Sequence, residues 1–155
     1  MTDMTLPPFQ TLLDDHGSDV HRYLRGLVGA SSVDDCFQEA LMSALVAYPQ
    51  LRHARNLRSW LFTIAHHKGI DHLRKAGREM PLPTMPDRAT TDELPRDAEL
   101  WGRVATLPTK QRAAVTLRYL GDMGYGDIAS IVDSSEAAAR QSVRAGLSAL
   151  RKELI

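Results

Sequence analysis

The sequence predicts an all-α protein of two small helical domains joined by a flexible linker. Apolar residues recur every three or four positions through most of the 155 residues, the period of helices with one buried face, and no segment has the alternation of a β-strand. Between residues 79 and 98 this period stops, and four prolines and an acidic balance indicate a linker. We expect one domain over residues 5–78 and another over 99–153.

Composition excludes several classes of protein. The chain is 43% hydrophobic and 25% charged, as globular domains are and fibrous or disordered chains are not. It has no run of eighteen apolar residues, and its N-terminal residues are acidic and contain proline, so we expect no membrane insertion, no signal peptide and a cytoplasmic protein. Cys36 is the single cysteine, which excludes an internal disulfide; its apolar neighbours favour a packed residue over a redox sensor.

The first domain begins with one or two helices from Phe9, with a break expected at Gly17 where Ser18 is available as a cap. Ser31 or Ser32 is expected to cap the next helix, which carries acidic residues in its first turn, where they suit the helix dipole, and stops at Pro49. Its expected apolar face consists of Cys36, Phe37, Ala40, Leu41, Ala44, Leu45 and Tyr48.

A long helix is expected over residues 56–78, with Asn56 as its cap and Gly77 as its end. Its buried face contains Trp60, Leu61, Ile64, Ala65 and Leu73. The opposite stripe steps by three or four residues and points into solvent: His67, Asp71, Arg74 or Lys75, and Arg78. This stripe and the basic loop before the helix form a candidate contact surface.

The second domain is expected to end in a helix-turn-helix. One short helix stops at Pro108, and the next ends at Gly121. A further short helix around Ile128 then leads through the turn Asp133–Ser135, with its serine cap, into a final helix. The buried stripe of that helix is Ala139, Val143, Leu147 and Leu150, so its outward face carries Arg140, Gln141 and Arg144.

The net charge of zero conceals a segregation of charge along the chain. Residues 1–50 hold two basic and seven acidic groups, 51–78 hold seven and one, 79–102 hold two and six, and 103–155 hold eight and five. Four of the six histidines also lie in the first basic segment. Two basic segments separated by acidic ones favour contact with nucleic acid, although a solvated helix face is the alternative for either segment alone.

The residues offer little for catalysis. His66, His67, Asp71 and His72 cluster in sequence, but one helix cannot direct all four toward a metal ion, and no P-loop, nucleophile elbow or carboxylate pair is present. We therefore expect neither an enzyme nor a cofactor. The alternatives are a stand-alone helix-turn-helix regulator, a protein that only sequesters a partner and, as the weakest, a metal-dependent enzyme.

Five motifs resemble the extracytoplasmic-function sigma factors of bacterial RNA polymerase in order and spacing. They are Asp34-Asp35-Cys36-Phe37-Gln38-Glu39, Arg58-Ser59-Trp60-Leu61-Phe62-Thr63-Ile64-Ala65, Asp71-His72-Leu73-Arg74, Leu107-Pro108 with Gln111-Arg112, and Tyr125-Gly126-Asp127-Ile128-Ala129. By this resemblance, residues 5–78 are similar to sigma region 2 and residues 99–153 to region 4. The resemblance implies a factor that binds core polymerase and recognises the minus-10 and minus-35 promoter elements.

The resemblance also implies roles for individual residues. Asp34, Asp35, Gln38 and Glu39 would dock on the β′ clamp helices, and region 4 on the β flap. The residues implied at the minus-10 element, which the factor helps to melt, are Arg52, Arg55, Arg58, Trp60, His66, His67, Asp71, Arg74, Lys75 and Arg78. Trp60 fits a stacking role and a core role equally. Those implied at the minus-35 element are Arg112, Ser135, Arg140, Gln141 and Arg144, and an anti-sigma partner is implied as well.

Two departures from the family pattern bear on promoter choice. His66 and His67 stand where the family often has Arg-Asn; if their protonation matters, promoter opening should strengthen below about pH 6.5, the unperturbed histidine value. In the final helix, Ser142 and Ala145 replace residues that are often basic. Fewer phosphate contacts predict weaker upstream binding and a shallower dependence on salt.

Overall fold

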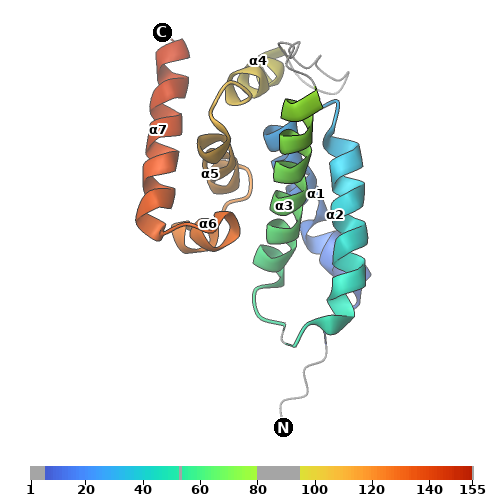
Figure 1. The fold of residues 1–155 in the computed structure, drawn as a ribbon. Helices are drawn as coiled ribbons and strands as arrows, with labels where there is room; N and C mark the ends of the chain where they lie inside the picture. Colours follow the sequence, from blue (N-terminus) through green and yellow to red (C-terminus); the bar gives the residue numbers. More distant parts are fainter. Residues whose placement is uncertain (1–5, 53, 80–94, 155) are drawn as a thin grey trace.

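The computed structural model describes residues 6–52, 54–79 and 95–154, and the regular structure within these ranges is helical (Figure 1). Helices α1 (Phe9–Val28), α2 (Val33–Ala47) and α3 (Leu57–Glu79) lie side by side, with the short 3₁₀ helix η1 (Tyr48–Gln50) after α2. Helices α4 (Pro95–Val104), α5 (Thr109–Tyr119), α6 (Tyr125–Val132) and α7 (Glu136–Leu154) follow. We call α1–α3 the N-terminal unit and α4–α7 the C-terminal unit.

Of the one or two helices expected from Phe9 the structure has one, and the helix breaks expected at Gly17 and Gly77 are wrong. Helix α1 runs without a break through Gly17, which is buried beside Phe37, and α3 continues past Gly77 to Glu79. A glycine inside a helix costs only about 1 kcal/mol relative to alanine, so the packing of the surrounding turns decides whether the helix continues. The cap of α3 is confirmed, because Asn56 Oδ1 accepts a hydrogen bond of 3.2 Å from the Ser59 backbone N–H.

The expected linker, residues 79–98, lies largely outside the described residues. Its two described ends are helical, since Glu79 belongs to α3 and α4 begins at Pro95. Proline is well tolerated in the first turn of a helix, where its missing N–H has no intrahelical partner to lose.

Close helix crossings hold each unit together. A Cβ added to Gly69 of α3 would lie 2.5 Å from Leu27 Cδ2 of α1, and a Cβ added to Gly146 of α7 would lie 2.5 Å from Val115 Cγ2 of α5. Both distances are far below van der Waals contact. An added methyl group at either position would therefore force the neighbouring side chain to shift, so glycine favours the close approach of these helices.

The two units share one hydrophobic core. Leu24, Phe62, Leu117 and Ile128 belong to the same buried cluster, which the packing of α1 on α5 and of α3 on α6 makes continuous. A smaller cluster lies within the C-terminal unit around Val104 and Leu150. In Figure 1, α5 and α6 lie between α3 and α7, so the described chain forms one compact body and the units are closed on one another.

A third glycine marks the contact between the units. A Cβ added to Gly26 of α1 would lie 2.8 Å from Thr116 Cγ2 of α5 and 2.9 Å from Trp101 Cζ3 of α4. Thr116 is buried, and its hydroxyl donates to the Arg112 carbonyl, so the residue cannot easily move aside. The closed arrangement thus depends on the absence of a side chain at Gly26.

Candidate nucleic-acid interface

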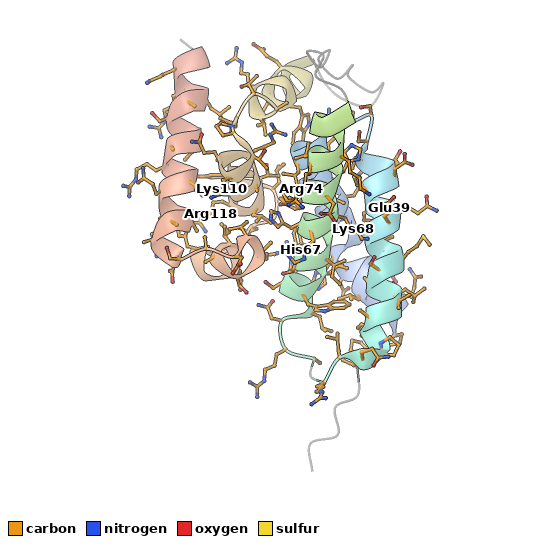
Figure 2. The ribbon with its side chains drawn as sticks, in the orientation of Figure 1. Glu39, His67, Lys68, Arg74, Lys110 and Arg118 are labelled. Carbon is orange, nitrogen blue, oxygen red and sulfur yellow. The ribbon has the colours of Figure 1, made fainter. Side chains whose placement is uncertain are left out.

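The outer face of α3 carries the predicted stripe. His67, Asp71, Arg74 and Lys75 are exposed, as the helical spacing predicted, and Arg74 lies 3.8 Å from Asp71 in an exposed ion pair. Figure 2 shows His67 and Arg74 following one another along the helix. Arg78 lies in α3, but its side chain is outside the described residues. The exposed pair of cations, Arg74 and Lys75, is available to a phosphate backbone.

The loop before α3 carries two further exposed cations. Arg52 and Arg55 are exposed in the non-helical segment between η1 and α3. Asn56 ends that segment with a left-handed backbone (φ 49°) and donates from its amide to Asp127 Oδ1 of α6, 3.1 Å away. The loop is therefore anchored to the C-terminal unit at its last residue.

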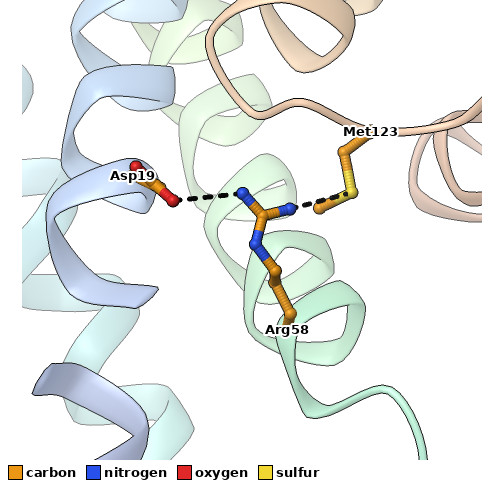
Figure 3. A network of polar contacts seen from close by, with 3 residues as sticks. All are labelled: Asp19, Arg58 and Met123. Carbon is orange, nitrogen blue, oxygen red and sulfur yellow. Dashed lines mark hydrogen bonds and ion pairs between the residues drawn. The ribbon is translucent and has the colours of Figure 1, made fainter. Parts of the chain in front are cut away.

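Arg58 lies between the units rather than on the outer face of α3. Its guanidinium donates to Asp19 Oδ2 of α1 at 3.2 Å and lies 3.3 Å from Met123 Sδ, in the loop before α6 (Figure 3). The same group stacks over the Phe62 ring at 4.8 Å. A side chain with three partners inside the closed chain is only 25% exposed and offers little of its guanidinium to DNA in this arrangement.

His66 is buried, unlike its neighbour. Its Nδ1 is hydrogen-bonded to the Tyr23 hydroxyl at 2.7 Å, across the contact of α1 with α3. Burial lowers the pKa of His66 to about 4, with a smaller contribution from His67, and raises the pKa of Tyr23. The hypothesis that His66 becomes protonated below about pH 6.5 at the DNA surface is therefore wrong, because the buried ring stays neutral until the pH approaches 4.

Trp60 packs in the N-terminal unit. Its ring centre is 5.9 Å from that of Tyr48, and the side chain is half-buried against the main core. Of the two roles that its spacing allowed, the structure shows the packing role.

The C-terminal unit forms the expected helix-turn-helix from α6 and α7. Asp133 takes the left-handed conformation (φ 57°) that ends α6, and Ser135 Oγ accepts a hydrogen bond of 3.0 Å from the Ala138 N–H at the start of α7. Arg140, Gln141 and Arg144 are exposed on α7. The serine is thus a helix cap, and the three longer side chains form an exposed face suited to a major groove.

Arg112 is placed between helices and not on this face. Its guanidinium donates to the carbonyl oxygens of Leu27 at 2.9 Å, Ala105 at 2.9 Å and Leu107 at 3.0 Å. Burial lowers its pKa. Because Leu27 belongs to α1, Arg112 is a second guanidinium that joins the two units.

Helix α2 presents an exposed face that the sequence revealed only in part. Asp34, Asp35, Gln38 and Glu39 are exposed on its N-terminal half, and Asp34 accepts from the His21 ring at 3.0 Å. Figure 2 shows Glu39 projecting from the helix. The C-terminal half continues the face with apolar side chains: Met42 is 62% exposed, Leu45 55% and Val46 76%.

The expectation that Leu45 is buried is therefore wrong, and Met42 and Val46 are functional candidates that sequence reasoning missed. An apolar segment that continues all round a helix is the signal that could have revealed them, because one packed side cannot cover it. An exposed apolar patch next to acidic residues is typical of a protein-binding surface.

Other classes of site are unsupported in the described part of the chain. No group of three or more His, Cys, Asp or Glu side chains there could hold a metal ion. Cys36 is buried, and burial raises the pKa of its thiol to about 11, so it behaves as a packed residue. None of the described helices is long and apolar enough to cross a membrane.

Two family models match the two units. The model of Sigma-70 region 2 matches residues 12–79, and that of Sigma-70, region 4 matches residues 97–150. The ECF RNA polymerase sigma factor SigD of Mycobacterium tuberculosis is 31% identical over 152 residues, which cover 88% of this chain and 72% of that protein. SigM of Bacillus subtilis is 27% identical over 132 residues, covering 77% and 78%.

Solved structures share the fold. RpoE of Bartonella quintana, in complex with the anti-sigma factor NepR, superposes with a TM-score of 0.83 at 21% identity, over 94% of this chain and 96% of that one. CnrH in complex with the cytosolic domain of CnrY gives a TM-score of 0.71 at 21% identity, over 94% and 86%.

The resemblance of the five motifs, the helix-turn-helix and the family matches agree. This chain belongs to the extracytoplasmic-function (ECF) sigma factors of the sigma-70 family, the non-enzymatic initiation factors that direct RNA polymerase to promoters.

Proposed function

We propose that this sigma factor uses three separate faces: α2 for core polymerase, the loop and outer face of α3 for the minus-10 element, and α7 for the minus-35 element. The observation that supports this division most strongly is that α3 and α7, which belong to different units, each present a pair of exposed cations: Arg74 and Lys75 on α3, and Arg140 and Arg144 on α7. Two cationic faces on separate units suit two elements on one extended DNA.

The polymerase-binding face consists of the acidic and polar residues Asp34, Asp35, Gln38 and Glu39, followed by the apolar patch Met42, Leu45 and Val46. In this proposal the β′ clamp helices cover the apolar patch, whose burial supplies most of the affinity, while the acidic half selects a basic partner surface. The β flap is the proposed partner of the C-terminal unit.

At the minus-10 element, the cations proposed to hold the non-template strand are Arg52, Arg55, Arg74, Lys75 and Arg78, with His67 and Asp71 beside them. In the final helix, Arg140 and Arg144 are proposed to read guanine and Gln141 adenine, since these side chains match the base edges in the major groove. Ser135 supports this face as its cap.

The closed arrangement cannot present both DNA faces to one promoter. Helix α3 packs on α6, and α6 packs on α7, so the axes of α3 and α7 are separated by two packing distances, or about 20 Å. Elements named minus-10 and minus-35 lie about 25 base pairs apart, which is about 85 Å of duplex at about 3.4 Å per pair. Even the full length of α3, about 34 Å for its 23 residues, does not span the difference.

Promoter recognition therefore requires the two units to separate, with residues 80–94 connecting them. Separation would break the contacts that Arg58 makes with Met123, Asn56 with Asp127 and Arg112 with Leu27. We propose that Arg58 reaches the minus-10 strand only in the open chain, and that Arg112 contacts DNA, if at all, in the same state. His66 remains a buried member of the contact between α1 and α3.

An anti-sigma factor is a further proposed partner. RpoE was solved with the anti-sigma factor NepR and CnrH with the cytosolic domain of CnrY, and both superpose on nearly the whole closed chain. A partner that binds the closed arrangement would hold the two units together. We also place the protein in the cytoplasm, where its polymerase acts.

Transcription by a holoenzyme reconstituted from core polymerase tests the division of faces. On a promoter fragment found by start-site mapping, the double variant R74A/K75A should lower strand opening, read with a base analogue, more than it lowers binding. The variant R144A should lower binding more than opening, and R151A, at the exposed far end of α7, should change neither. Equal losses of both quantities in the two variants, or no loss in either, would contradict the division.

A further inference from the structure

One tyrosine ring contacts two arginines in the helix-turn-helix unit. The guanidinium carbon of Arg118 lies 4.7 Å from the ring centre of Tyr125, and that of Arg140 lies 4.5 Å from it. Arg118 belongs to the last turn of α5, Tyr125 is the first residue of α6, and Arg140 lies on α7. A single ring thus connects the three helices that build the proposed minus-35 face.

The ring and its first arginine are fixed by the fold. Arg118 Nη1 donates to the Met123 carbonyl at 3.0 Å, which ties this guanidinium to the loop between α5 and α6. Tyr125 is half-buried and packs against the main core at the start of α6. The ring is therefore a rigid platform, held on one side by the core and contacted by an arginine that is itself anchored.

Arg140 meets this platform from the recognition helix. Its Nη2 donates to Glu136 Oε1 at 3.0 Å, and its side chain is still 54% exposed. The ring and the carboxylate together define the direction of the guanidinium while leaving part of it accessible. Gln141 and Arg144 are exposed on the same helix.

Such an arrangement affects recognition because a long side chain loses rotamer freedom when it binds a base edge. A guanidinium already restrained over an aromatic ring loses less, so binding is stronger and the wrong base is rejected more strongly. The contribution expected from one restrained side chain is about two- to tenfold in affinity.

We propose that Tyr125 is a positioning residue for the minus-35 element, which acts by holding the Arg140 guanidinium toward the major groove. Arg118 takes part by fixing the ring. The inference rests on the proposed role of Arg140 in reading that element, and it names a residue outside the recognition helix on which the reading depends.

A double-mutant cycle in the reconstituted holoenzyme tests whether Tyr125 positions Arg140. The variants are Tyr125→Leu, Tyr125→Phe, Arg140→Ala and the pair Y125L/R140A, measured for affinity to the promoter fragment and to the same fragment with 7-deazaguanine in the minus-35 element. This base analogue lacks the N7 acceptor that arginine uses. Tyr119→Leu, at an exposed tyrosine at the end of α5, is the matched control.

Tyr125→Leu should weaken binding about two- to tenfold and reduce discrimination against the analogue, while Tyr125→Phe, which keeps the ring, should retain both. In the R140A background, Y125L should add no further loss. The positioning role of Tyr125 would be overturned if the affinity losses of Y125L and R140A multiplied in the double variant, or if Tyr125→Phe bound the promoter as weakly as Tyr125→Leu. Neither result would affect the assignment of Arg140. If R140A binds the promoter as tightly as the wild type, and the wild type binds the analogue as tightly as guanine, the assignment of Arg140 is refuted and this inference with it.

Discussion

Gly26→Ala should open the closed chain while it strengthens the helix that carries it. The new Cβ would lie 2.8 Å from Thr116 Cγ2, whereas ordinary contacts begin at 3.4 Å, so the helices must move apart by roughly half an ångström or more. Overpacking of this kind costs about 1–3 kcal/mol. Within α1 alone, alanine is better than glycine by about 1 kcal/mol, so the cost falls on the contact between the units.

A loss of about 1–3 kcal/mol in that contact shifts the ratio of closed to open chain by a factor of roughly 5 to 150 toward open. If core polymerase binds only the open chain, its apparent affinity rises by up to the same factor, because the fraction able to bind increases. A substitution in a helix crossing would then improve binding to a partner. This combination is not expected from a change that merely damages the fold.

Small-angle scattering and core-binding titrations measure the two effects. A compact chain of this length has a radius of gyration of about 15 Å, and the open form is larger. Gly69→Ala, which crowds Leu27 inside the N-terminal unit, should destabilise without improving binding, and Gly102→Ala, which meets nothing within 4 Å, should do neither. A Gly26→Ala protein with unchanged dimensions and unchanged or weaker core binding would refute the reasoning.

Two further predictions concern single side chains. The pKa of His66 is about 4 in the folded chain and near the ordinary 6.5 when unfolded, so the unfolded state binds more protons between these values. The contribution of His66 to the free energy of unfolding is therefore fully present above about pH 6.5, and roughly 3 kcal/mol of it is lost by pH 4. Urea unfolding at several pH values should show this loss, and a His66→Gln variant that keeps the same slope would contradict it. Val46→Ser should weaken core polymerase binding about tenfold without changing the melting temperature, since the side chain is 76% exposed. Leu100→Ser, at a 48% exposed position of α4, is its control, and equal effects of the two would count against the α2 face.

The helices could be predicted from the sequence because each carries a periodic apolar face. Asn56 was correctly predicted as a cap, and the serine cap expected in the turn 133–135 is Ser135, since capping chemistry is local. Ser32 stands at the N-cap position of α2 but makes no side-chain cap hydrogen bond, so that expected cap is wrong. The helix breaks predicted at Gly17 and Gly77 are wrong because the helix propensity of a single glycine is a small local effect, and tertiary packing outweighs it.

The candidate site likewise contains features that a single helix determines and features that depend on contacts between distant segments. The exposure of His67 and Arg74 follows from position on one helix and was predicted. The contacts of Arg58, His66 and Arg112 join residues 39, 43 and 85 positions apart, which no periodicity within a helix can reveal. Contact between the units depends on Gly26 and Thr116, small residues that do not stand out in an apolar pattern.

The basic segments of the chain therefore serve two purposes, and conformation decides between them. In the closed chain, the guanidinium groups of Arg58 and Arg112 bind partners across the units, so the positive charge available to DNA is smaller than the sequence suggests. Each phosphate contact contributes to affinity and to its salt dependence, so releasing these groups strengthens DNA binding as well as extending its span. If the two units separate as proposed, opening couples the reach needed for two promoter elements to the charge needed to hold them, and we expect the free, closed chain to bind DNA weakly.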